Sequence, residues 1–161
     1  MVTFWYFDLD DTLTDFTCVL DPYRFVHLKG WFANLKPKDT TFINYLTTRK
    51  DTKNHILSHL PVSPYAEEEK IDWCHKYIFG VKDQNILLLP FFKPKSTMVP
   101  NLTPLHILVD DNISCVKDWV LKGGTGVHFT GDYIVHSQKG KFLVEGSLPR
   151  EELYYKILSY I

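Results

Sequence analysis

Cysteine is scarce in this sequence, and its spacing excludes two common ways of stabilising a small fold. The three cysteines are Cys18, Cys74 and Cys115, and no two of them form a C-x-x-C pair. A zinc site or a disulfide framework is therefore not expected. An odd, scattered set of cysteines is typical of reduced thiols, so we expect a cytoplasmic protein.

Long hydrophobic runs are also missing. No apolar stretch approaches the roughly 20 residues that span a bilayer, so we expect no membrane partner. The chain does not open with a basic segment followed by an apolar one, so no signal peptide is expected.

Neither sign of charge is in excess. The chain has 18 Lys and Arg residues and 19 Asp and Glu residues, which gives a formal net charge of −1. This balance argues against a protein whose whole surface binds nucleic acid, and it leaves room for a local basic rim. With 161 residues, 45% of them hydrophobic, and no repeat or linker, the chain is expected to form a single domain over residues 1–161.

What the sequence does contain is an alternation of strand and helix patterns. Short apolar runs predict strands at residues 2–7, 41–47, 85–89, 106–109 and 126–129, and a hairpin at 135–144. Helical patterns occur at residues 22–34, 51–60, 67–79, 112–122 and 149–161. The alternation predicts an α/β fold, a three-layer Rossmann-like sheet of mostly parallel strands with helices on both faces and no large cap domain.

The first predicted strand ends in two closely spaced aspartates, Asp8 and Asp10, and Thr12 follows. Because side chains alternate along a strand, a D-x-D pair starts on one face. Two neighbouring carboxylates raise each other's pKa unless a cation offsets their charge, and Mg²⁺ prefers such oxygen ligands. One carboxylate is then able to act as a nucleophile while the other carries protons.

Other polar residues follow the later strands, where ligands of parallel sheets bind. A hydroxyl follows the second predicted strand, and Thr47 is favoured over Thr48 because it comes first. The fourth predicted strand leads directly into the acidic pair Asp110 and Asp111.

Two lysines, Lys93 and Lys95, follow the third predicted strand, and either could bring its positive charge to the carboxyl end of the sheet. Lys95 opens the segment that leads into the turn before the fourth strand, whereas Lys93 precedes Pro94 and is expected to turn outward. We therefore favour Lys95 and keep Lys93 as the alternative.

The order of these residues (D-x-D-x-T, a hydroxyl, a lysine, an acidic pair) resembles the haloacid dehalogenase (HAD) superfamily over about residues 1–130. That superfamily consists mostly of Mg²⁺-dependent phosphatases that work through an aspartyl-phosphate. The resemblance implies the following roles: Asp8 as nucleophile, Asp10 as acid and base, Thr47 and Lys95 as phosphoryl-binding residues, and Asp8, Asp10 (through its carbonyl), Asp110 and Asp111 as Mg²⁺ ligands.

HAD phosphatases carry a cap domain in one of two segments. Here these segments lie between Thr12 and the second strand and between Thr48 and Lys95, and both are too short for a cap domain. The run from Asp110 to Gly126 also resembles small, capless, nucleotidase-like HAD proteins. We expect a phosphorylated small molecule such as a nucleotide as substrate, selected by residues 14–38. A phosphatase of nucleic-acid ends and a non-catalytic binding module remain the alternatives.

Overall fold

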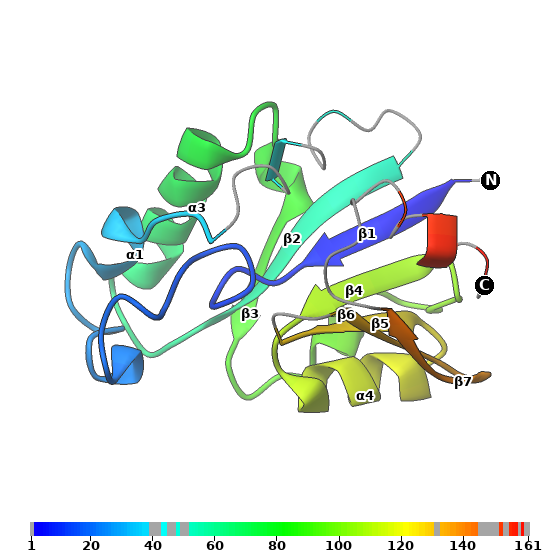
Figure 1. The fold of residues 1–161 in the computed structure, drawn as a ribbon. Coiled ribbons are helices and arrows are strands. Elements are labelled where there is room, and N and C mark those ends of the chain that lie inside the picture. The colour runs from blue at the N-terminus through cyan, green and yellow to red at the C-terminus, as the bar shows by residue number, and fades with distance from the viewer. Residues whose placement is uncertain are drawn as a thin grey trace.

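The computed structural model describes residues 2–38, 43–44, 48, 52–130, 133–144, 152, 155–157 and 159. Within these residues, one seven-stranded sheet has the order β3-β2-β1-β4-β5-β6-β7 (Figure 1). The strands are β1 (Thr3–Phe7), β2 (Thr52–Leu60), β3 (Ile86–Pro90), β4 (His106–Asp110), β5 (Thr125–Phe129), β6 (Tyr133–Ser137) and β7 (Gly140–Val144). The strands from β3 to β5 in this order pair in parallel, and β6 and β7 add antiparallel pairs. The fold is therefore α/β with a mostly parallel sheet, as the sequence predicts.

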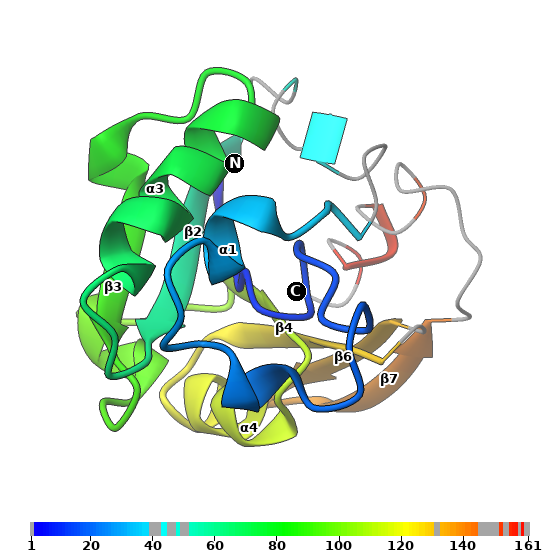
Figure 2. The same ribbon diagram turned by 90° about the vertical axis from the view of Figure 1, so that its left-hand side faces the viewer.

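The described helices are α1 (Trp31–Asn34), α3 (Ala66–Tyr77) and α4 (Ile113–Leu121), with short 3-10 turns η1 (Pro22–Arg24), η2 (Asp83–Asn85) and η3 (Lys95–Met98). Helix α1 contacts α3, whereas α4 packs along β4 and β5. Figure 2 shows α1 and α3 next to each other and α4 apart from them. No helix within the described residues combines the length and apolarity needed to cross a membrane.

The central strands are buried through alternating side chains. One core cluster joins β1 and β4 to α1 and α3, and includes Phe7, Val109, Phe32 and Trp73. The other joins the same strands to α4, and includes Tyr6, Leu108 and Trp119. Because both sets of side chains are buried, these strands appear in the sequence as nearly continuous apolar runs.

The order of the strands places a switch point beside β1. From β1 the chain continues to β2 and β3 on one side, and it then returns to β4 on the other side of β1. In open parallel sheets, ligands bind in the crevice at the carboxyl ends of the strands next to such a point. Asp8 directly follows β1 and Asp110 ends β4, so both predicted acidic motifs lie there.

The second strand is not where the sequence pattern predicts it. The predicted helix at residues 51–60 is wrong, because Thr52–Leu60 forms β2 between β1 and β3. Ile56 and Leu57 are both buried, one in each core cluster, because successive side chains of a strand point to opposite faces of the sheet. Of the predicted strand at 41–47, only Ile43 and Asn44 are described, and both are helical.

The predicted helix at residues 22–34 is also wrong as a continuous element. Only η1 and the single turn of α1 are helical, and Gly30 lies between them with φ of 85°. The backbone N–H groups of Gly30 and Phe32 donate to the carboxylate of Glu69 on α3. This segment therefore forms a flap that is tied to α3.

The remaining predicted elements agree with the structure where it describes them. These are β1, α3, β3, β4, α4, β5 and the β6–β7 hairpin. Asn112 caps α4, as its side chain accepts from Ser114 N–H at 2.9 Å. Of the predicted C-terminal helix, Glu152, Tyr155–Ile157 and Ser159 are helical, and the rest lies outside the described residues.

Candidate active site

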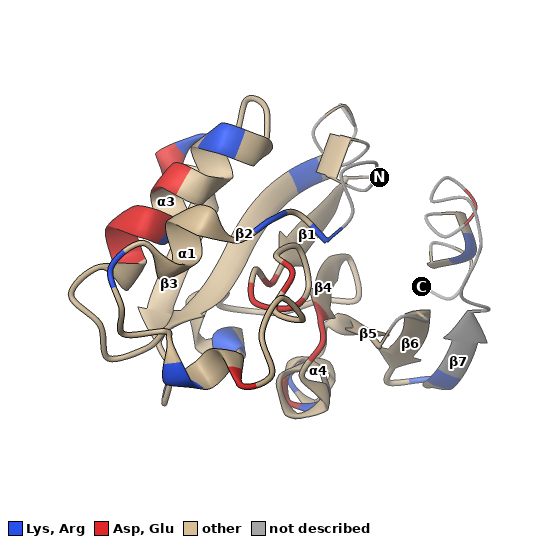
Figure 3. Cartoon of the chain, turned by 60° about the vertical axis from the view of Figure 1, so that its left-hand side comes forward, with Lys and Arg blue, Asp and Glu red and all other residues tan. Residues whose placement is uncertain are grey.

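The two acidic motifs meet at the carboxyl ends of β1 and β4. The backbone N–H of Asp8 donates to Val109 O at 2.9 Å, which continues the pairing of the two strands beyond β1. Acidic segments gather at these strand ends in Figure 3. A cavity of about 410 Å³ opens here, and its lining includes Asp8, Asp10, Lys95, Asp110 and Asp111.

Lys95 lies between the two motifs. Its Nζ is 2.6 Å from Asp8 Oδ1 and 2.7 Å from Asp110 Oδ2, and its side chain is only 2% exposed. Burial opposes the charged ammonium group, yet the charges of Asp8 and Asp110 outweigh it and hold the pKa of Lys95 above its usual range. Lys93, the alternative considered from the sequence, is exposed.

Three carboxylates are close enough to share a metal ion. Asp8, Asp110 and Asp111 each offer one oxygen, and these oxygens lie within 4.8 Å of one another. The ligands of a Mg²⁺ ion lie within about 4.2 Å of one another, so a small inward shift would suffice. The side chain of Asp10 is not part of this group.

The Thr12 hydroxyl connects the two halves of this group. It accepts a hydrogen bond from the Asp111 backbone N–H at 3.1 Å, and it lies 3.5 Å from Asp8 Oδ2. The threonine of the D-x-D-x-T pattern thus connects the segment after β1 to the end of β4.

The charge of the site fits a divalent cation. Among the described residues, two ammonium groups lie against these carboxylates, those of Lys70 and Lys95. With Asp8, Asp10, Asp110 and Asp111 all ionised, the described part of the site therefore has an excess of two negative charges. Burial, together with neighbouring carboxylates, raises the pKa of Asp110 to about 6 and that of Asp111 to about 7. Such shifts are expected for buried carboxylates that lie close to one another.

Lys70 belongs to the site, although the sequence pattern did not single it out. Its Nζ lies 2.7 Å from Asp10 Oδ2. The signal that was available is helical spacing, because Lys70 shares one face of α3 with buried Trp73 and Cys74. Burial raises the pKa of Asp10, with a contribution from Asp8, and the charge of Lys70 opposes that rise.

The predicted hydroxyl residue, Thr47, lies outside the described residues. The strand on which its assignment depended is wrong, because the strand beside β1 is β2 and not residues 41–47. The alternative, Thr48, is exposed and helical. Near the carboxyl end of β2 the structure has instead Ser58, which is buried and whose Oγ accepts from Lys70 Nζ at 3.0 Å.

The wall of the cavity away from the carboxylates is apolar and aromatic. Tyr23 and Val26 of the flap, His59 at the end of β2, Val62, and Phe91 after β3 line it. Tyr23, Val62 and Phe91 are also well exposed, so a ligand could contact them. The chain just after the flap is anchored beside the first motif, since Lys38 Nζ lies 2.9 Å from Asp11 Oδ1.

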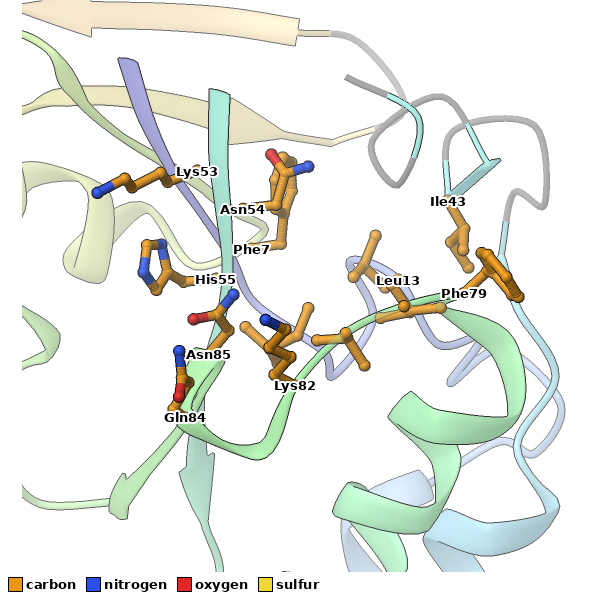
Figure 4. Close-up of a pocket in the computed structure, with 14 residues that line it drawn as sticks. Phe7, Leu13, Ile43, Lys53, Asn54, His55, Phe79, Lys82, Gln84 and Asn85 are labelled. Atoms are coloured by element: carbon orange, nitrogen blue, oxygen red, sulfur yellow. The ribbon is translucent and has the colours of Figure 1, made fainter. Parts of the chain in front are cut away.

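A second cavity of about 450 Å³ lies along the amino-terminal part of β2 and the turn before β3 (Figure 4). Its polar lining includes Lys53, His55, Lys82 and Gln84, and its apolar lining includes Phe79. None of the four site carboxylates lines this cavity. Its polar side chains come from the amino-terminal part of β2 and the turn before β3, and not from the carboxyl ends of the strands, so it is a weaker candidate for a catalytic site.

No protein-family model matches the chain, and a search of the curated proteins finds no match either. The functional assignment therefore depends on the residues of the site and on their order in the sequence.

Proposed function

We propose that this protein is a Mg²⁺-dependent phosphomonoester hydrolase of the HAD type, which works through an aspartyl-phosphate on Asp8. The observation that carries the proposal is the position of Lys95, buried between Asp8 and Asp110 at 2.6 and 2.7 Å, with Asp111 beside them. Phosphoryl transfer requires positioning and charge neutralisation above all, and this arrangement supplies both. The proposal includes the three-layer Rossmann-like arrangement with helices on both faces.

In the first step, a carboxylate oxygen of Asp8 attacks phosphorus and the bond from phosphorus to the leaving oxygen breaks. Asp10 gives its proton to that oxygen, which leaves as an alcohol. Burial favours the protonated form of Asp10, as a general acid requires. Lys95 stabilises the negative charge of the phosphoryl oxygens beside Asp8.

In the second step, the Asp10 carboxylate takes a proton from water as the water oxygen attacks phosphorus. The bond from Asp8 to phosphorus breaks, which releases inorganic phosphate and restores both aspartates. Asp8, Asp110 and Asp111 would hold Mg²⁺, with Asp10 contributing its backbone carbonyl. When bound, the ion would offset the carboxylates and polarise the phosphoryl group.

The substrate class follows from the cavity wall. Exposed Tyr23 and Phe91 flank the carboxylates, which suits a phosphoester with a planar group such as a nucleotide. The second candidate function is a phosphatase that acts on nucleic-acid ends, and the third is a non-catalytic binding module.

Phosphate release from a panel of nucleotides, sugar phosphates and end-phosphorylated oligonucleotides tests the proposal. We expect turnover with Mg²⁺, none with EDTA, and recovery on adding Mg²⁺ back. Binding that weakens steeply with salt would favour the oligonucleotides. Full turnover in metal-free buffer, or no turnover on any member of the panel, would contradict the proposal.

A further inference from the structure

Lys70 is one of the largest fully buried side chains in the described part of the molecule, at 1% exposure. Lysine is almost never fully buried unless it is paired. Its Nζ donates to Asp10 Oδ2 at 2.7 Å, to Ser58 Oγ at 3.0 Å and to His59 O at 2.6 Å. These three acceptors match the three donors of an ammonium group, so its direction is fixed.

The partner of Lys70 is the carboxylate that would act as acid and base. One oxygen of Asp10, Oδ2, is held by Lys70. The other, Oδ1, is buried and has no hydrogen-bond partner among the described residues. The two oxygens are therefore unequal, and Oδ1 is the position left for a transferable proton.

We propose that Lys70 is a positioning residue, which orients Asp10 so that Oδ1 transfers the proton to and from the substrate. This inference rests on the proposed function and deepens it. Lys70 does not line the cavity, whereas Asp10 and Lys95 do, so Lys70 acts through Asp10 and not on the phosphoryl group. The two buried lysines thus have separate tasks, Lys95 on the nucleophile and Lys70 on the acid and base.

Ser58 and His59 of β2 fix the position of the Lys70 ammonium group, because both accept hydrogen bonds from it. Lys70 itself comes from α3, while Asp10 follows β1, so three separate elements meet at one ammonium group. The ring of Phe32 on α1 lies against it, with Nζ 4.5 Å from the ring centroid. Because Lys70 is itself held from several sides, it fixes the position of Asp10 Oδ2 without help from substrate.

The test compares two substrates that differ in their need for a general acid. An aryl phosphate such as p-nitrophenyl phosphate has a good leaving group, whereas an alkyl phosphate needs a proton on its leaving oxygen. We expect Lys70→Met to lower kcat/KM about 10²-fold or more for the alkyl ester and less than about tenfold for the aryl ester. Lys76→Met, an exposed lysine on the same helix, is the control and should leave both unchanged.

A double variant tests whether Lys70 acts through Asp10. In an Asp10→Asn background, Lys70→Met should cost little further activity on either ester. Equal losses on both esters in Lys70→Met, with BeF₃⁻ binding at Asp8 retained, would overturn the inference. A large additional loss in the double variant would do the same.

If Lys70→Met does not fold, Lys70→Arg provides the test. The guanidinium group keeps the charge but presents its donors differently, so the alkyl ester should still suffer more than the aryl ester. An unchanged ratio of the two would overturn the inference. A wild-type protein that hydrolyses neither ester with Mg²⁺ would contradict the proposed function itself, and that result is distinct from an unchanged ratio.

Discussion

At the scale of single residues, the site depends on an ammonium group that is buried between carboxylates. Lys95 contacts both the carboxylate proposed as nucleophile and a proposed metal ligand, at 2.6 and 2.7 Å. A buried charge is costly unless it is paired, and here each charge in the pair explains the burial of the other. Lys95 thus joins the acidic motif that follows β1 to the acidic motif at the end of β4.

Replacing Lys95 should therefore be far more damaging than replacing Lys93. Lys95→Ala removes the charge that would stabilise the phosphoryl oxygens, and we expect kcat/KM to fall by about 10²–10³. Lys93→Ala is the matched control, since its side chain is exposed, and should change the rate less than about twofold. The reverse result would place the catalytic lysine two residues earlier.

The two aspartates of the first motif should respond differently to the same change. Asp8→Asn removes the nucleophile, so turnover and capture of BeF₃⁻ should both disappear. Asp10→Asn removes only the acid and base, so turnover should fall by about 10²–10⁴ while BeF₃⁻ is still captured. A normal rate in Asp8→Asn would refute the assignment of the nucleophile.

Some residues of the candidate site can be predicted from the sequence, and others cannot. Asp8, Asp110 and Lys95 were predictable because each directly follows an apolar run or opens a turn after one. Lys70 was not, because it follows three glutamates in a segment that looks solvated. Only its position on the apolar face of α3, together with its distance to Asp10, distinguishes it from an ordinary surface lysine.

At the scale of elements, the misplaced strand explains the largest error about the site. In β2 the polar Asn54, His55 and Ser58 interrupt the apolar residues, so the segment lacks the continuous run that identifies β1 and β4. Its conformation is set by pairing with β1 and β3 on both edges, which no local pattern encodes. The hydroxyl expected after the second strand was therefore assigned to Thr47, from the wrong segment.

The flap and the loop after β3 should control the choice of substrate. Tyr23 and Phe91 are exposed beside the carboxylates, so Tyr23→Ala or Phe91→Ala should lower kcat/KM for a nucleotide about tenfold relative to a sugar phosphate. Phe79→Ala removes an exposed ring that lines the other cavity and should leave this ratio unchanged. If all three variants change only thermal stability, specificity does not come from this wall.

At the scale of the whole molecule, the crowded carboxylates connect folding to pH and metal. The folded-state pKa values of Asp110 and Asp111, about 6 and about 7, exceed the ordinary 3.8. At pH values between 3.8 and these raised pKa values, the folded protein binds more protons than the unfolded chain. Both groups therefore make the metal-free protein less stable as the pH rises through this range. Mg²⁺ would bind the deprotonated carboxylates and reverse this loss.

Melting temperatures at pH 5 and pH 8, in EDTA and in Mg²⁺, test this linkage. The stabilisation by Mg²⁺ should be larger at pH 8 than at pH 5. Asp111→Asn should weaken this pH dependence, whereas Asp72→Asn on the exposed side of α3 should not. Equal stabilisation by Mg²⁺ at both pH values would argue against a metal held by these carboxylates.

The most direct test of the central claim is the location of a covalent phosphoryl group. The protein would be mixed with a hydrolysed phosphomonoester and Mg²⁺, quenched in acid during turnover and mapped by peptide mass spectrometry. The account predicts a phosphoryl group on the peptide that contains Asp8, absent with EDTA and in Asp8→Asn. Turnover with the phosphoryl group on another residue, or equal turnover by Asp8→Asn, would contradict it.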